Sequence, residues 1–155
     1  MPIFGNGRIG FNLVIRYVSI LVTAQIQRQR TSKIMQNSGQ LDSISYLTCP
    51  DGSKRAYLHH EGRKEGPGLV FLAGHGSDMF GTKADALHQM ACSHNIPFLR
   101  FDYFGHGLSD GAFLDGTITK WVNDCVMMLD QLTTGPQILV GSSLGGWLMI
   151  RTAQE

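Results

Sequence analysis

The chain has 155 residues, of which 43% are hydrophobic and 16% are charged, and its formal net charge is +1. This length and balance suit one globular domain and exclude a disordered chain. The basic residues are diluted by apolar ones and belong to no nucleic-acid-reading motif, so no nucleic-acid partner is expected.

Residues 1–40 differ from the rest of the chain in charge. They contain no acidic residue, and their basic residues are Arg8, Arg16, Arg28, Arg30 and Lys33. Arg16 interrupts the apolar stretch 9–26, so no stable membrane span is expected there. This composition predicts a mitochondrial transit peptide. The alternatives are an extension of no function, with Met35 as the effective start in the cytoplasm, and a membrane anchor.

Residues 41–155 are predicted to form an α/β domain. A turn at Pro50-Asp51-Gly52 predicts a hairpin of two antiparallel strands, and strands and helices alternate after it. Short loops between them indicate parallel βαβ units. The predicted strands are Ser43–Thr48, Lys54–His60, Leu69–Ala73, Ile96–Phe101 and Gln137–Val140. The predicted helices are Thr82–His94, Ile118–Leu132 and one that begins at a serine after residue 140. The first carries apolar residues at helical spacing, at Ala84, Leu87, Met90 and Ala91. The second is expected to turn an apolar stripe inward, formed by Trp121, Val122, Cys125, Val126, Leu129 and Leu132.

The last strand and helix enclose a Gly-x-Ser-x-Gly motif. Gly141 and Gly145 flank Ser143, and the strand–turn–helix context makes this the nucleophile elbow of an α/β-hydrolase. A serine on such a turn has a strained backbone, and the glycines keep β-carbons out of the crowded junction. Ser143 is therefore the predicted nucleophile. The amide of Leu144, at the helix N-terminus, is a predicted oxyanion donor.

Two further turns follow buried strands. In this fold the loop after the third strand donates the other oxyanion amide, which places that donor at the backbone of His75. The segment from Asp102 to Ser109 has two turn glycines but no helix-opening Gly-x-Gly-x-x-Gly, so it is interpreted as a tight turn pinned by Asp102 and Ser109.

Metal chemistry is not expected. Four histidines lie on a predicted strand and helix with no metal-ligand spacing between them: His59, His60, His88 and His94. The cysteines form no Cys-x-x-Cys pair, which favours buried thiols over a disulfide framework or a zinc site, namely at Cys49, Cys92 and Cys125. No cofactor is predicted.

Several of these stretches resemble one α/β-hydrolase family, the mitochondrial palmitoyl-protein thioesterases, also described as mycophenolic acid acyl-glucuronide esterases, with close bacterial relatives. The stretches that carry the resemblance are Gly81–Ala84, Phe101–Ser109, Lys120-Trp121 and, most specifically, Gly135–Met149. The resemblance covers about Ser43 to Ala153. It implies serine-dependent hydrolysis of acylated small molecules or S-acylated proteins, without a cofactor. Ser143 would be the nucleophile, with oxyanion amides from His75 and Leu144, although His75 stands where an aromatic residue is expected.

The residues after Ser143 include no histidine and no aspartate. In this fold the triad runs serine, then acid, then histidine along the chain. The sequence therefore corresponds to the N-terminal half of an α/β-hydrolase fold, and the 155 residues are expected to be inactive by themselves. The alternative is a non-catalytic, hydrolase-like binding module.

Overall fold

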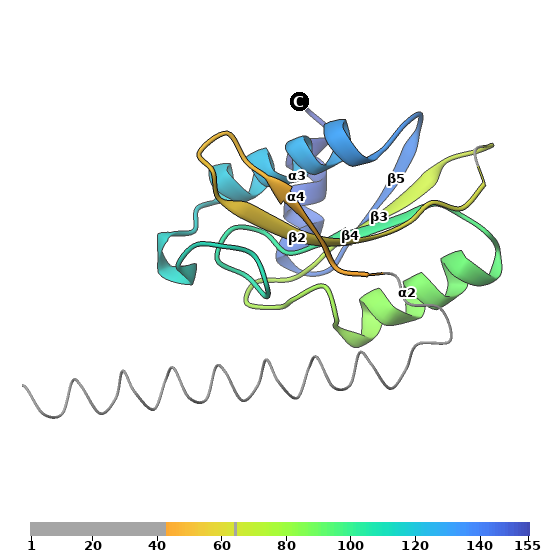
Figure 1. The fold of residues 1–155 in the computed structure, drawn as a ribbon, viewed down its shortest axis with the longest axis horizontal. Helices are drawn as coiled ribbons and strands as arrows, with labels where there is room; N and C mark the ends of the chain where they lie inside the picture. Colours follow the sequence, from red (N-terminus) through yellow and green to blue (C-terminus); the bar gives the residue numbers. More distant parts are fainter. Residues whose placement is uncertain (1–42, 64) are drawn as a thin grey trace, which may run out of the picture. The chain divides into compact units, whose positions relative to one another are not determined.

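A computed structural model describes residues 43–63 and 65–155 as a mixed sheet flanked by helices (Figure 1). The expected leader, residues 1–40, lies outside the described residues. The strands are β1 (Ser45–Thr48), β2 (Lys54–His60), β3 (Gly68–Leu72), β4 (Phe98–Phe101) and β5 (Gln137–Gly141). The helices are α2 (Thr82–Ser93), α3 (Ile118–Leu132) and α4 (Leu144–Thr152), with a short 3₁₀ helix, η1 (Phe113–Asp115).

The sheet has the strand order β1-β2-β4-β3-β5. Strands β1 and β2 form the predicted antiparallel hairpin, and β2 is also antiparallel to β4. Strand β3 runs parallel to both of its neighbours, β4 and β5, as the alternation of strands and helices predicts. Strand β4 begins at Phe98 and not at Ile96, because Pro97 has no amide hydrogen to donate to a ladder.

Helix α2 lies on one face of the sheet, and α3 and α4 lie together on the other (Figure 1). The core between the layers includes Val70, Phe98, Phe101, Met128 and Leu148, all fully buried. The expectation of buried thiols is wrong for Cys92, which lies on the exposed side of α2. This helix turns only its Ala84 and Ala91 side fully into the core, and Met90 is 37% exposed.

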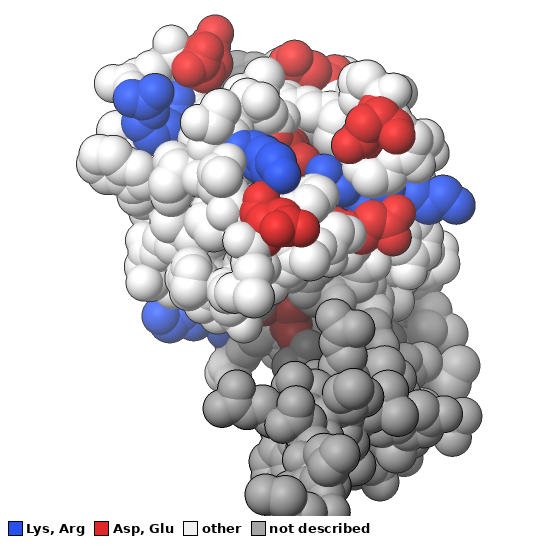
Figure 2. All heavy atoms as spheres, turned by 90° about the vertical axis from the view of Figure 1, so that its left-hand side faces the viewer, with Lys and Arg blue, Asp and Glu red and all other residues white. Residues whose placement is uncertain are grey.

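The described surface carries mixed charge. Acidic and basic side chains are interspersed on the face that Figure 2 presents. Within residues 43–63 and 65–155, no helix is long and apolar enough to cross a membrane.

Helix α4 packs very closely on the sheet. A β-carbon on Gly145 would collide with the carbonyl oxygen of Leu72 at the end of β3. A β-carbon on Gly141 would collide with the carbonyl group of Gly145 and the amide nitrogen of Gly146. The two glycines of the motif are thus required by contact with backbone atoms, which cannot rotate away as a flexible side chain could.

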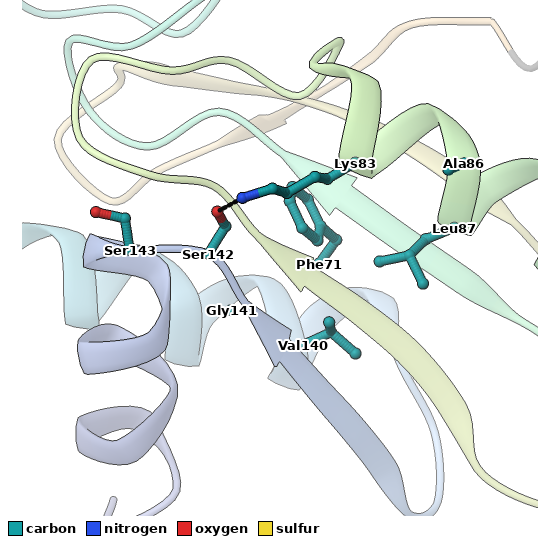
Figure 3. Close-up of a pocket in the computed structure, with 8 residues that line it drawn as sticks. All are labelled: Phe71, Lys83, Ala86, Leu87, Val140, Gly141, Ser142 and Ser143. Atoms are coloured by element: carbon teal, nitrogen blue, oxygen red, sulfur yellow. Dashed lines mark hydrogen bonds between the residues drawn. The ribbon is translucent and has the colours of Figure 1, made fainter.

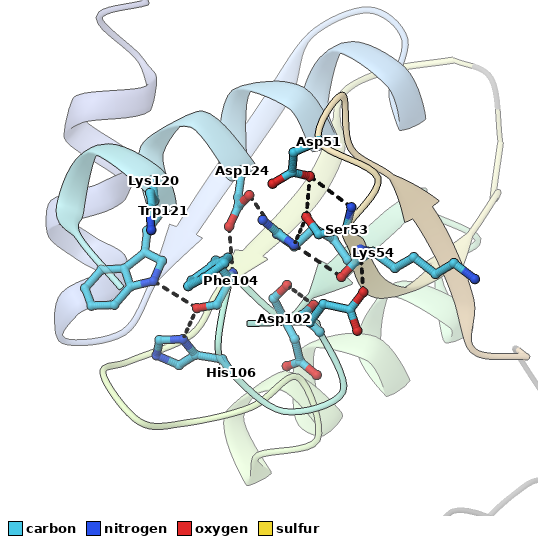
Figure 4. Close-up of polar contacts among 12 residues, drawn as sticks. Asp51, Ser53, Lys54, Asp102, Phe104, His106, Lys120, Trp121 and Asp124 are labelled. Atoms are coloured by element: carbon cyan, nitrogen blue, oxygen red, sulfur yellow. Dashed lines mark hydrogen bonds and ion pairs between the residues drawn. The ribbon is translucent and has the colours of Figure 1, made fainter. Parts of the chain in front are cut away.

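A buried ion pair joins β2 to α3 (Figure 4). Arg55 Nε donates to Asp124 Oδ1 at 2.8 Å, and the two side chains are only 5% and 7% exposed. The other carboxylate oxygen of Asp124 accepts from the amide of Phe104 at 2.7 Å. Burial raises the pKa of Asp124 above its ordinary value, although Arg55 and that amide favour the charged form.

The glycine contacts predict opposite results for two adjacent substitutions in α4. Gly145→Ala should lower the free energy of unfolding by about 1–3 kcal/mol or more, because the new methyl group overlaps backbone. Gly146→Ala is the matched control. Its β-carbon would meet nothing nearer than the Gly141 oxygen at 3.9 Å, so stability should hold or rise by up to about 1 kcal/mol. Urea unfolding followed by circular dichroism measures both, and equal losses would contradict the close packing.

The ion pair predicts a large effect from its carboxylate. Asp124→Ala should lower the free energy of unfolding by about 3–5 kcal/mol, because it leaves the Arg55 charge buried without its partner. Asp130→Ala, on the exposed side of the same helix, should change it by less than about 0.5 kcal/mol. The same urea titrations compare the two, and a small effect of Asp124→Ala would show that Arg55 reaches water.

Candidate active site

Ser143 lies at the turn between β5 and α4, in the predicted strand–turn–helix arrangement. Its backbone has φ 54° and ψ −117°. Of the non-glycine residues described, only Asn95 and Ser143 have a positive φ. Such a conformation costs about 1–3 kcal/mol and persists only where the surroundings impose it. The close packing of Gly141 and Gly145 supplies those surroundings.

The Ser143 side chain is exposed and does not cap the helix that it precedes. Its hydroxyl therefore accepts no hydrogen bond from the backbone N–H groups of the first helical turn, which have no acceptor within the helix. Leu144 is the first residue of α4, so its amide has no acceptor within the helix, and the partial positive charge of the helix N-terminus lies beside Ser143. A hydroxyl next to such an amide can attack a carbonyl whose oxygen then accepts from the amide.

Ser142 differs from Ser143 in direction and in partner (Figure 3). The Ser142 hydroxyl turns toward α2 and accepts from Lys83 Nζ at 2.9 Å, whereas the Ser143 hydroxyl points away from that contact. The Ser142 amide donates to the Leu72 carbonyl at 3.0 Å and so extends the pairing of β5 with β3. Only the second serine of the pair is at the apex of the turn.

An open pocket of about 500 Å³ adjoins the elbow on the α2 side (Figure 3). Its walls are mainly apolar, from β3, β5 and α2, and its polar rim is formed by Lys83, Ser142 and Ser143. The apolar lining residues are Phe71, Ala86, Leu87, Val140 and Gly141.

The loop after β3 reaches the elbow through Gly74. A β-carbon on Gly74 would lie 3.3 Å from the Ser142 carbonyl oxygen and 3.5 Å from the Ser143 β-carbon. His75, next in the chain, is exposed, and its ring meets Phe113 at a centroid distance of 4.9 Å and Trp121 at 6.0 Å. The loop that carries the predicted donor is thus brought to Ser143, while the His75 imidazole lies against η1 and α3.

The turn after β4 is pinned as expected. Asp102 accepts from the amides of Met79 at 2.7 Å and Leu108 at 2.8 Å. Ser109 Oγ donates to the Asp102 carbonyl at 2.6 Å and accepts from the Ala56 amide at 2.9 Å. The Asp102 carboxylate also occupies the space that a β-carbon on Gly107 would need, so this carboxylate organises backbone.

A partner for the Ser143 hydroxyl is not found among residues 43–63 and 65–155, where no hydrogen bond reaches it from another side chain. The same residues contain no group of three or more histidine, cysteine or acidic side chains that could hold a metal ion. None of the three cysteines forms a disulfide.

Two contacts of the site were missed by sequence reasoning. Lys83 meets Ser142, and the imidazole of His106 meets the amide of Gly76 at 3.2 Å. Both pairs are far apart in the chain and have no local spacing that marks them. The only signal was that Lys83 and His106 fall within stretches that carry the family resemblance.

Known proteins that resemble this chain in sequence and in fold are hydrolases. Bovine palmitoyl-protein thioesterase ABHD10, mitochondrial, is 47% identical over 111 residues, which is 72% of this chain and 36% of the bovine protein. The mouse alpha/beta hydrolase domain-containing protein 10 superposes with a TM-score of 0.68 at 44% identity, over 72% of this chain and 44% of the mouse chain. A putative hydrolase from Agrobacterium vitis also has a TM-score of 0.68, at 40% identity and with the same coverage.

The match is partial in the other direction, because the chain spans less than half the length of these relatives. Residues 69–154, which include both turns and the elbow, match the alpha/beta hydrolase family. The chain belongs to the alpha/beta hydrolase family.

Proposed function

We propose that Ser143 is the nucleophile of a serine hydrolase that cleaves acyl thioesters and carboxylic esters, with the amides of Leu144 and His75 as oxyanion donors. The observation that carries the proposal is the strained backbone of Ser143, at a turn whose two glycines touch backbone and allow no side chain. Strain of this kind concentrates at functional sites. The substrate class is an S-acylated protein or an acylated small molecule, including acyl glucuronides, and its support is the likeness to mammalian palmitoyl-protein thioesterases.

The 155 residues by themselves are proposed to turn over slowly. No histidine or aspartate follows Ser143, and no described side chain activates its hydroxyl. A serine without a base is a weak nucleophile at neutral pH. Oxyanion stabilisation and binding alone leave a residual acceleration of about 10³–10⁴ over water.

The two serines of the elbow provide a matched pair for the test. A fluorophosphonate probe should label the purified 155-residue chain slowly, and added imidazole should accelerate the labelling by acting as the missing base. Ser143→Ala should reduce labelling to background, whereas Ser142→Ala should keep most of it, because the Ser142 hydroxyl accepts from Lys83 and does not lie at the apex of the turn. Peptide mass spectrometry locates the adduct. Labelling at Ser142, or none at Ser143 even with imidazole, would refute the nucleophile, and rapid labelling without imidazole would refute the slow turnover.

A non-catalytic binding module is the second candidate, favoured by exposed apolar side chains. Trp147 and Ile150 on α4 are 55% and 52% exposed, and Ile138 on β5 is 49% exposed. An unreactive Ser143 together with concentration-dependent association in analytical ultracentrifugation would favour this role. A reactive Ser143 favours the hydrolase.

The proposed location is the mitochondrion, with residues 1–40 as a transit peptide. Its support is the basic, acid-free composition of that segment and the mitochondrial address in the names of the mammalian relatives. Residues 1–40 fused to a fluorescent protein should direct it to mitochondria. The chain from Met35 onward, fused to the same fluorescent protein, should remain in the cytoplasm. Cytoplasmic fluorescence from both fusions would contradict the transit peptide.

A further inference from the structure

The loop after β3, residues 74–77, is held in place by few hydrogen bonds. The Tyr103 hydroxyl donates to the Ala73 carbonyl at 3.1 Å just before the loop, and the Ser77 amide donates to the Gly74 carbonyl at 3.0 Å within it. The one side chain from another segment that bonds a described amide of this loop is His106, whose Nε2 lies 3.2 Å from the Gly76 nitrogen. That bond therefore fixes the middle of the loop, next to the predicted donor.

The partners of His106 determine its protonation state. The Gly76 amide can only donate, so Nε2 must carry the lone pair. On the other side of the ring, Nδ1 lies 3.1 Å from the Phe104 carbonyl, which can only accept, so Nδ1 carries the hydrogen. The neutral Nδ1–H tautomer is the one form of the ring that makes both bonds.

His106 is itself rigidly supported (Figure 4). The Phe104 carbonyl also accepts from Trp121 Nε1 at 3.1 Å, and the Phe104 amide donates to Asp124. The His106 side chain is buried, at 3% exposure. A continuous set of contacts thus runs from α3 through Phe104 and His106 to the Gly76 amide.

The charges that face His106 come from each neighbouring segment. The ring of His75, on the loop itself, lies 6.4 Å from the His106 ring and disfavours a positive charge on His106. Asp124 on α3 favours a positive charge there. Tyr103, with its ring at 5.4 Å, is a phenol whose pKa burial raises, so it stays neutral. Burial outweighs the other influences and lowers the pKa of His106 below its ordinary 6.5.

We propose that His106 is a positioning residue, whose neutral imidazole holds the loop 74–77 beside Ser143 by accepting the Gly76 amide hydrogen, and whose protonation releases that loop. An imidazolium has a hydrogen on both nitrogens, so Nε2–H would face the Gly76 N–H and the bond would be lost. Because the pKa is lowered in the folded state, the hold is present above the ordinary pKa of 6.5 and is lost as the pH falls through the lower pKa of the folded state. Release of the loop would also move the His75 amide, and the effect of that movement on an oxyanion rests on the proposed function. The bond between His106 and the loop does not depend on the proposed function.

The hold is tested on the full 155-residue chain by nuclear magnetic resonance. The Gly76 amide and the His106 ring should titrate together between about pH 8 and about pH 5, with one midpoint below 6.5. In His106→Gln the side chain can still accept from Gly76 and donate to Phe104, so the amide should keep its bond and lose its titration. In His106→Leu, hydrogen exchange of the Gly76 amide should accelerate by about tenfold, because the acceptor is gone. His94→Gln, an exposed residue at the end of α2, should change neither.

A Gly76 titration that persists in His106→Gln, or a His106 ring that titrates without moving the Gly76 amide, would overturn the proposal. Slow phosphonate labelling of Ser143 supplies the second readout. In the unmodified chain, the labelling rate should fall at acid pH together with the Gly76 titration. At a pH above the midpoint, His106→Leu should lower the labelling rate by about tenfold. His106→Gln should label at the original rate and should not lose that rate at acid pH. An unchanged rate in His106→Leu would overturn the link to the oxyanion. A chain whose Ser143 never reacts would refute the proposed function alone, because the Gly76 titration would still decide whether His106 holds the loop.

Discussion

The structure depends on how closely helix α4 approaches the ends of strands β3 and β5. Gly145 rests on the Leu72 carbonyl, and Gly141 rests on the first turn of the helix. Because no β-carbon separates these backbones, the chain must reverse within Ser142 and Ser143, and the left-handed conformation falls on Ser143. The same approach aims the N-terminus of α4 at the space above the serine. Exposed hydroxyl, strained backbone and unpaired helix amide are thus three consequences of one packing constraint.

A second framework of buried polar groups surrounds this junction. Asp124 bonds Arg55 and the Phe104 amide, so it joins β2, α3 and the segment after β4. Asp102 bonds the amides of Met79 and Leu108 and so joins that segment to the loop before α2. Buried carboxylates that accept from backbone amides specify loop positions that apolar contacts alone would leave variable. The loop that faces Ser143 is joined to this framework by the bond of Gly76 to His106, and the residue two positions after it, Met79, is held by Asp102.

Much of the fold follows from local sequence. The limits of β2 and α3 are as the pattern predicts, because a turn at Pro50–Gly52 and a regular apolar stripe define them. Ser143 could be singled out because its glycines have a fixed spacing. The roles of Lys83 and His106 could not, because each meets its partner only after β3, β4 and β5 have paired. The exposure of Met90 could not be predicted either, because helical spacing indicates a face but not how much of that face the sheet covers.

The central claim is that the junction of β5 and α4 presents Ser143, and not Ser142, to an acyl carbonyl with the Leu144 amide behind it. A crystal structure of the chain after reaction with an alkyl phosphonate tests this most directly. We expect a bond from Ser143 Oγ to phosphorus, with the phosphonyl oxygen about 2.7–3.1 Å from the Leu144 amide nitrogen. An adduct on Ser142, or a phosphonyl oxygen turned away from the start of α4, would contradict it.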